Sequence, residues 1–241
     1  MKDTLQIGLY GKLPAYGDFI TRNLNADFIA VWDEWLQHYI SASREQIGDE
    51  WLDIYLTSPI WRFAFSSGVI NERVWAGIMM PSVDRVGRYF PISIVKPFHA
   101  SVSPVNLIAH QHAWFEQLEA QCLSALDGEM DADELSETVG QLEFSPTDLY
   151  QPTVHLGEQG SMVVGLKSAD LDATTQVLPY LLNANLSSAW SSFSLWQTDG
   201  SDLISPAIFC SQGLPAIGGI ASMLDGQWQK RNWKIPYNPM L

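Results

Sequence analysis

The stretch WRFAFSSGVINERVWAGIMMPSVDRVGRYFPISIV, residues 61–95, contains three runs rich in β-branched, aromatic and other apolar residues. These runs cover residues 61–66, 73–80 and 89–95, and the turn signals Ser67-Gly68 and Pro81-Ser82 lie between them. Apolar runs of this length that are bounded by Gly, Pro and Ser are typical of β-strands. The stretch therefore predicts three strands in succession.

A long amphipathic helix is predicted before these strands, at residues 27–47. Its apolar side chains recur every three or four residues, which places them in one stripe along a helix. Asn25 or Asp27 can cap its start, and Gly48 can end it. We interpret the stripe as a face buried in the core; its members are Phe28, Val31, Trp32, Trp35, Leu36, Tyr39 and Ile40.

Helices and strands alternate in the rest of the chain as well. Ser103 followed by Pro104 predicts the start of a helix that runs to Leu126. Further helices are predicted at 131–142, at 170–182 with a bend or an end near Pro179, and at 215–224, and further strands at 5–10, 154–156, 161–166, 189–197 and 203–210. Strand groups interrupted by helices predict an α/β fold: a mixed β-sheet with helices packed on its faces, sandwich-like. We expect one domain, residues 1–241, and a subdivision near 130–150 is the alternative.

The charge of the chain restricts its partners. The 241 residues carry a formal net charge of −14, which argues against nucleic acid and anionic lipid, because both need a basic surface. Residues 97–166 contain no Lys or Arg, and eleven acids lie between Glu116 and Glu158. The acidic 116–148 region is interpreted as a solvated helical face, and a docking surface for a basic partner is the alternative.

Neither a membrane segment nor a disulfide framework is predicted. No apolar stretch approaches the roughly 18 residues of a membrane-spanning helix, and no signal peptide is recognised at the N-terminus. The two cysteines, Cys122 and Cys210, have no metal-binding or redox spacing. We expect a soluble, cytoplasmic protein.

The glycines and lysine of IGLYGKLPAYGDFITR, residues 7–22, resemble a phosphate-binding loop only superficially. A Walker loop needs a longer spacing before Gly-Lys and a Ser or Thr after it, whereas Leu13 follows Lys12 here. Pro14 also favours extended backbone over the start of a helix. We therefore predict a strand, a turn and a re-entering segment that bind no nucleotide. No catalytic or metal-binding spacing was found elsewhere, so no cofactor and no metal are expected.

Three blocks of the sequence together resemble a known family. They are GKLPAYGDFI at residues 11–20, SPIWRF at 58–63 and MPSVDRVGRYFPISI at 80–94, and their order and content are similar to the TagF family of type VI secretion-associated proteins. The resemblance implies an α/β sandwich-like domain without a cofactor. It also implies a non-enzymatic, cytoplasmic repressor that acts after translation, in some systems by binding a forkhead-associated scaffold protein.

The residues of these blocks are expected to play two kinds of role. A structural role in shaping the backbone or filling the core is expected for Gly11, Pro14, Gly17, Asp18, Trp61, Pro81, Gly87 and Pro91. The candidates for partner binding are Asp84, Arg85, Arg88 and Arg62, because guanidinium groups can present planar forks to carboxylates or phosphates.

A second interpretation of these charged residues is structural. Asp84 would then pair with Arg85 or Arg88, or with Arg62 or Arg22, and lock the connection between two strands by buried hydrogen bonds. The sequence favours this interpretation, since Gly87 and the flanking prolines look like requirements of backbone shape. Two other functions stay open: a structural component of the secretion apparatus, and an enzyme whose site has no recognised motif.

Overall fold

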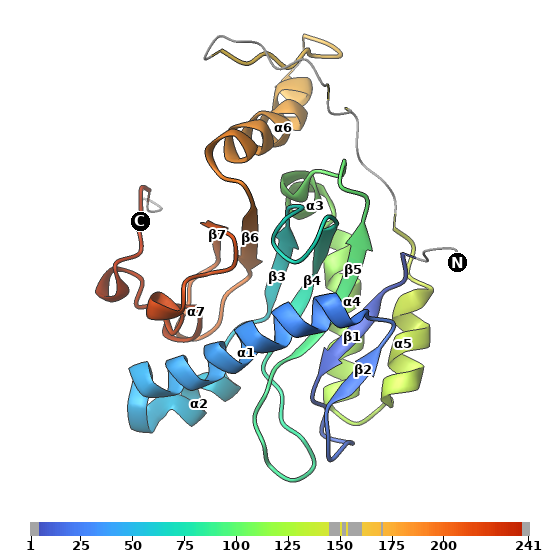
Figure 1. Ribbon diagram of the computed structural model, residues 1–241, viewed down its shortest axis with the longest axis vertical. Coiled ribbons are helices and arrows are strands. Elements are labelled where there is room, and N and C mark those ends of the chain that lie inside the picture. The colour runs from blue at the N-terminus through green and yellow to red at the C-terminus, as the bar shows by residue number, and fades with distance from the viewer. Residues whose placement is uncertain (1–4, 145–149, 151–152, 154–160, 170, 238–241) are drawn as a thin grey trace.

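In the part of the chain that the structure describes, seven strands form one sheet in the order β2-β1-β5-β4-β3-β6-β7 (Figure 1). The computed structural model describes residues 5–144, 150, 153, 161–169 and 171–237. The strands are β1 (Gly8–Gly11), β2 (Ile20–Arg22), β3 (Trp61–Phe65), β4 (Val74–Met80), β5 (Ile92–Phe98), β6 (Phe193–Thr198) and β7 (Ala207–Gln212). The sheet unites strands from both ends of the chain, because β3 pairs with β6.

The predicted α/β class with helices on the faces of a sheet is confirmed, with one difference in strand direction. A mixed sheet was expected, but every pair of neighbouring strands in the described residues is antiparallel. For the central strands β3, β4 and β5 the reason is the length of the connections. The segments that join β3 to β4 and β4 to β5 are too short for a crossover, so each one reverses the chain.

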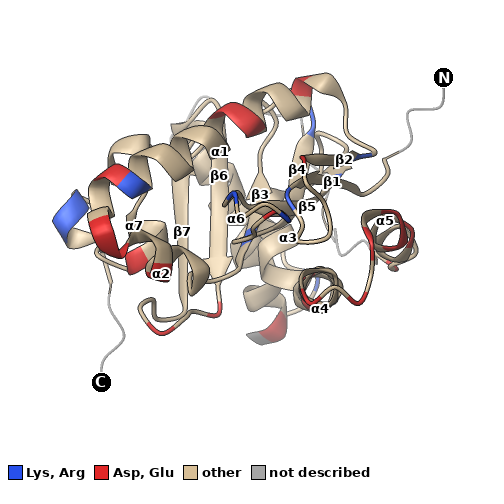
Figure 2. Ribbon diagram, turned by 90° about the horizontal axis from the view of Figure 1, so that it is seen from below, with Lys and Arg blue, Asp and Glu red and all other residues tan. Residues whose placement is uncertain are grey.

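Helices cover both faces of the sheet. The helices are α1 (Ala26–Ile47), α2 (Trp51–Leu56), α3 (Pro104–His110), α4 (His112–Leu126), α5 (Ala132–Gly140), α6 (Leu171–Ala189) and α7 (Ser222–Asp225). Buried side chains of α1, α2 and α7 form one core cluster with the sheet, and those of α3, α4 and α5 form a second cluster on its other face. Seen from below, the strands lie between these two layers (Figure 2).

The side chains of strand β3 are divided between the two core clusters. Its aromatic side chains Trp61, Phe63 and Phe65 belong to the α1 cluster, whereas Ala64 belongs to the α4 cluster. Successive side chains of a strand point to opposite faces, so this alternation follows from the strand geometry. Both faces are buried, so the run is apolar except for Arg62, a buried residue that pairs with Glu119 of α4.

The aromatic stripe of α1 is buried, as predicted. Asn25 caps the helix by accepting a hydrogen bond from the backbone N–H of Phe28 at 3.0 Å, and Gly48 ends it with a φ of +82°. The fully or nearly buried members of the stripe are Phe28, Trp32, Trp35, Leu36 and Tyr39, and Val31 and Ile40 are partly buried.

Several predicted elements differ from the structure. The helix expected from Pro104 to Leu126 is divided at Gln111 into α3, which contacts β3, β6 and α6, and α4, which contacts β4 and α5. Residues 161–166 have no regular structure, and the strand expected at 154–156 lies outside the described residues. Helix α6 continues through Pro179 to Ala189. The helix expected at 215–224 consists of a 3-10 turn, Ile217–Gly219, and the short α7.

The elements α2 and β2 were not predicted, and β6 and β7 begin four residues later than expected. Helix α2 and strand β2 are short, and β6 and β7 are preceded by residues that continue the strand-like pattern. Local periodicity therefore does not define the ends of these elements accurately. In the part of the chain that the structure describes, no helix combines the length and the apolar character needed to cross a membrane.

Candidate functional site

The connection between β4 and β5 is a tightly ordered turn centred on Asp84. Within it the backbone N–H of Asp84 donates to Arg88 O at 3.1 Å, and that of Gly87 donates to Asp84 O at 3.0 Å. Gly87 has a φ of +83°, a conformation that side-chain-bearing residues rarely adopt. The carboxylate of Asp84 completes the turn, because its Oδ1 accepts from the backbone N–H of Val86 and of Arg88 at 3.0 and 2.9 Å.

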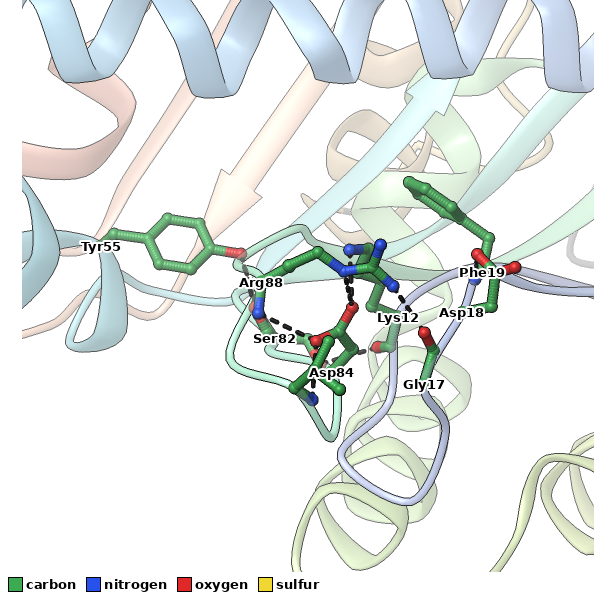
Figure 3. Close-up of polar contacts among 9 residues, drawn as sticks. Lys12, Gly17, Asp18, Phe19, Tyr55, Ser82, Asp84 and Arg88 are labelled. Carbon is green, nitrogen blue, oxygen red and sulfur yellow. Dashed lines mark hydrogen bonds and ion pairs between the residues drawn. The ribbon is translucent and has the colours of Figure 1, made fainter.

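Asp84 also forms two ion pairs (Figure 3). Its Oδ2 lies 2.8 Å from Lys12 Nζ and 2.6 Å from Arg88 Nε, and the Asp84 side chain is fully buried. Burial by itself would raise the pKa of Asp84. The hydrogen bonds from Lys12, Arg88 and Val86 outweigh burial and hold the pKa well below its ordinary value. The carboxylate is therefore ionised throughout the physiological range.

The hairpin formed by β1 and β2 supports this turn from one side. The backbone N–H of Arg85 donates to Tyr16 O at 2.8 Å, and Arg88 Nη2 donates to Gly17 O. Gly11, in β1, has a φ of +138°, and a Cβ there would collide with the backbone of Pro91. The close approach of the two chain segments thus requires a glycine at this position.

Helix α2 supports the turn from the other side. Tyr55 OH donates to Ser82 O at 3.0 Å and accepts from Ser82 N at 3.0 Å, while Ser82 Oγ donates to Lys12 O at 2.7 Å. Burial raises the pKa of Tyr55 above its ordinary value, so its hydroxyl keeps the proton that it donates. The connection is thus held by the β1–β2 hairpin and by α2, both of which are distant from it in the sequence.

The outer side of this turn presents a small exposed surface, which we call the motif surface: Arg85, Val86 and Arg88 of the turn and Phe19 of the hairpin. Val86 is 66% exposed, the side chain of Arg88 is 54% exposed, and Arg85 and Phe19 are exposed as well. The Arg85 guanidinium has no ion pair with any described residue and lies against Gly17. Phe19 packs edge-to-face on Phe90 at 4.8 Å.

The structure separates Arg62 from the motif surface. Arg62 is 2% exposed, and its guanidinium pairs with both carboxylate oxygens of Glu119 in α4, at 2.5 and 3.0 Å, and with Asp199 at 2.8 Å. Burial would lower the pKa of Arg62, but these carboxylates raise it. Arg22 pairs with Asp133 at 2.6 Å. Asp84 therefore pairs with Arg88, and neither Arg62 nor Arg22 is its partner.

The remaining residues of the three sequence blocks have separate positions. Trp61 is buried and donates its indole N–H to Met223 O at 3.0 Å. Asp18 is exposed and accepts from the backbone N–H of Phe19 at 2.8 Å. Pro14 and Gly17 are partly buried in the loop that joins β1 to β2, and Pro81 is partly buried directly after β4.

Lys12, Tyr55, Phe19 and Val86 contribute to the site but were not predicted from the sequence. Lys12 offered a signal, because a lysine within the apolar run IGLYGKLP must find a buried partner or leave the sheet. Its ammonium is directed at Asp84 and lies 4.9 Å from the centre of the Phe19 ring. Two guanidinium groups beside apolar side chains have the chemistry to bind an acidic, partly apolar segment.

The acidic helices α4 and α5 lie on the opposite face of the sheet from α1 (Figure 2). Two of their acids have internal partners, since Glu119 pairs with Arg62 and Asp133 with Arg22. In the described ranges, no group of three or more His, Cys, Asp or Glu side chains is arranged to hold a metal ion.

Residues 8–142 match the family model of the TagF N-terminal domain, described as type VI secretion system-associated. The chain is also similar to a solved structure, the crystal structure of PA0076 from Pseudomonas aeruginosa PAO1, with 33% sequence identity and a TM-score of 0.80. That similarity covers 98% of this chain and 100% of the other. No curated protein sequence is significantly similar to the chain. The family match includes the hairpin, the turn around Asp84 and helices α1 to α5.

Proposed function

Because the chain belongs to the TagF family of type VI secretion-associated proteins, we propose that it represses type VI secretion after translation by binding a scaffold protein with a forkhead-associated domain. The protein acts in the cytoplasm and performs no chemical reaction. Binding withdraws the scaffold from assembly by mass action, so the levels of the apparatus proteins stay unchanged.

The main support for this proposal is the composition and exposure of the motif surface. Arg85 is an exposed guanidinium without an ion-pair partner among the described residues, and it lies beside the exposed Val86 on a turn held by two ion pairs to the buried carboxylate of Asp84. A rigid turn loses little conformational entropy on binding, and an arginine next to apolar area is typical of residues that dominate interfaces. These features support docking of an acidic surface of the scaffold at this turn.

The four charged residues of the motif contribute to binding in different ways. Arg85 would contact the partner directly. Arg88 would do so with the part of its guanidinium that Asp84 and Gly17 leave available. Asp84 is a positioning residue, because its carboxylate is buried and holds the turn. Arg62 lies in the core against α4 and supports the fold.

The test is a pull-down of the forkhead-associated scaffold with purified wild type and two variants. Arg85→Ala should reduce the affinity about tenfold or more, as expected for loss of an interface arginine. Its thermal unfolding should be unchanged, because its side chain has no internal ion pair. Lys230→Ala, which removes an exposed cation from the C-terminal segment, is the matched control and should bind like wild type.

Two results would contradict the proposal at different points. If the wild type fails to bind the scaffold, this partner is wrong. If Arg85→Ala binds as the wild type does and binding weakens as salt rises, the acidic 116–148 region is the docking surface instead, since exposed charges are screened within about 8 Å at physiological ionic strength. Overproduction in cells gives the functional readout: secretion should stop while the apparatus proteins keep their levels.

A further inference from the structure

Strand β7 forms one edge of the sheet, and its outer side is unpaired in the described part of the chain (Figure 1). The register pairs Trp196 with Phe209, and the backbone N–H of Gly213 donates to Ser192 O at 3.0 Å. Hydrogen-bonded positions alternate along an antiparallel pair. Phe209 and Ser211 therefore direct their backbone groups toward β6, whereas Ile208, Cys210 and Gln212 direct theirs away from the sheet.

The side chains of these same three residues are exposed. Ile208 is 63% exposed, and Cys210 and Gln212 are exposed too. Ile208 lines an apolar groove of about 670 Å³ together with Leu178 and Leu182 of α6. The other face of β7 is covered, because Phe209 packs against Trp61, Trp196 and Trp233. Among the described residues, the outward backbone groups of β7 have no strand partner, and the side chains on one of its two faces are exposed.

Natural proteins protect free edges with charged residues, prolines, bulges or very short strands. The opposite edge, β2, has such protection: it is three residues long, ends in Arg22, and contacts α5 through the Arg22–Asp133 ion pair. Strand β7, with the sequence AIFCSQ, has six residues and contains no charge, proline or glycine. An edge of this composition is suited to pairing with another strand.

We propose that β7 pairs with β7 of a second copy of this chain, antiparallel and about a two-fold axis at Cys210. This register places Cys210 opposite the same residue of the partner, and Ile208 opposite the partner's Gln212. All three outward-directed residues then form hydrogen-bonded pairs. An interface that pairs the same strand of both copies closes at the dimer, so it explains a free edge without open-ended polymerisation.

The distribution of charge is compatible with a second copy of the chain at β7. The whole chain carries −14, and two copies repel each other wherever acidic surfaces meet. Residues 199–241, which comprise β7 and the segments on either side of it, contain three acids, Asp199, Asp202 and Asp225, and three bases, Lys230, Arg231 and Lys234, which gives a net charge of zero. The net charge of −14 thus comes from the rest of the chain, so two copies repel each other less at the end that contains β7.

The first test is the oligomeric state of the purified full chain, measured by light scattering over a wide concentration range. The wild type should be a dimer, and Ile208→Lys should raise the dimer dissociation constant about tenfold or more, because it places a charge in the dimer interface. Val86→Lys changes an equally exposed apolar residue on the motif surface and should leave the dimer intact. A monomeric wild type, or a dimer that Ile208→Lys leaves unchanged, overturns the proposal.

The second test fixes the register with a short bis-maleimide. Opposed residues of a hydrogen-bonded antiparallel pair have Cα atoms about 5.5 Å apart, so Cys210 of the two copies should cross-link efficiently. Cys122 does not compete, because it is fully buried and burial raises its pKa to about 12. Cys210→Ser should abolish the product. A dimer that is not cross-linked through Cys210 overturns the register. Dimerisation does not depend on scaffold binding, so either proposal can fail without the other.

Discussion

Asp84 is the single residue on which the candidate site depends most. Its carboxylate accepts from two backbone amides and pairs with Lys12 and Arg88, so every oxygen lone pair that faces the turn has a partner. Lys12 is itself 4% exposed and would be left as a buried, uncompensated charge without it. Breaking such a pair costs far more than an exposed pair is worth.

The low pKa of Asp84 makes the stability of the protein depend on pH. A carboxyl group with a folded-state pKa below its unfolded value stabilises the native state fully above the unfolded value, about 3.9, and this contribution is lost as the pH falls through the folded value. Asp84→Asn should therefore have a lower melting temperature than wild type at neutral pH. The difference should shrink below about pH 4.

Thermal unfolding monitored by circular dichroism at several pH values measures this effect. Asp18→Asn is the matched control, because Asp18 is an exposed aspartate of the neighbouring hairpin. It should follow the wild-type curve. A constant difference between Asp84→Asn and wild type at all pH values would show that the Asp84 charge is not the source of its stabilisation.

Helix α1 is the element that organises one of the two cores. Trp32 stacks on Trp35 at 5.0 Å and contacts Phe63 at 5.1 Å, and its indole N–H donates to Ser93 Oγ at 3.1 Å. Trp35 donates to Pro215 O at 3.1 Å and so connects the helix to the C-terminal segment. The helix thus holds the sheet and the segment after β7 together.

Removal of one aromatic ring from this helix should destabilise the whole protein. Trp35→Ala should lower the free energy of unfolding by about 3–5 kcal/mol, the usual cost of truncating a buried aromatic side chain. Equilibrium unfolding in urea measures it. His38→Ala on the exposed side of the same helix should change the free energy by less than about 0.5 kcal/mol. Equal effects of the two substitutions would refute burial of the stripe as the source of stability.

The two halves of the molecule meet at Arg62. This side chain lies in β3 and contacts Glu119 of α4 and Asp199 of the segment between β6 and β7, residues 57 and 137 positions away. Its Nη1 also lies 2.8 Å from Nδ1 of His112. One buried guanidinium therefore connects the N-terminal strands, the acidic helices and the C-terminal strands.

Arg62→Leu should lower the free energy of unfolding by about 3 kcal/mol or more, because it leaves the largely buried Glu119 without its charge partner. Arg62→Lys should recover only part of the loss, since an ammonium cannot reproduce the two parallel hydrogen bonds to a carboxylate. Arg22→Leu breaks an ion pair with the exposed Asp133 and should cost less than about 1 kcal/mol. Urea unfolding of the three variants provides the comparison; similar losses for Arg62→Leu and Arg22→Leu would contradict the account.

The sequence by itself determined the elements whose pattern is local. The stripe of α1, its end at Gly48 and the existence of strands β3 to β5 follow from local patterns, because a helical or extended period is visible within a short length of chain. The sequence left the N-cap open between Asn25 and Asp27, and β5 begins three residues later than expected. The same reasoning was wrong at residues 161–166, where an apolar run of strand length has no regular structure. For Asp84 the sequence left four possible partners, Arg85, Arg88, Arg62 and Arg22, and the structure pairs it with Arg88, four positions away.

Only the tertiary structure decided which distant residues meet. The position of β1 between β2 and β5 brings Lys12 to Asp84 across 72 positions of sequence, and the pairing of β3 with β6 brings Asp199 to Arg62. Local periodicity contains no information about such partners, since any buried cation would suit any buried carboxylate. The choice is made by strand order and register, which depend on the packing of both cores at once. For the same reason, the free edge at β7 became visible only when the order of the strands was known.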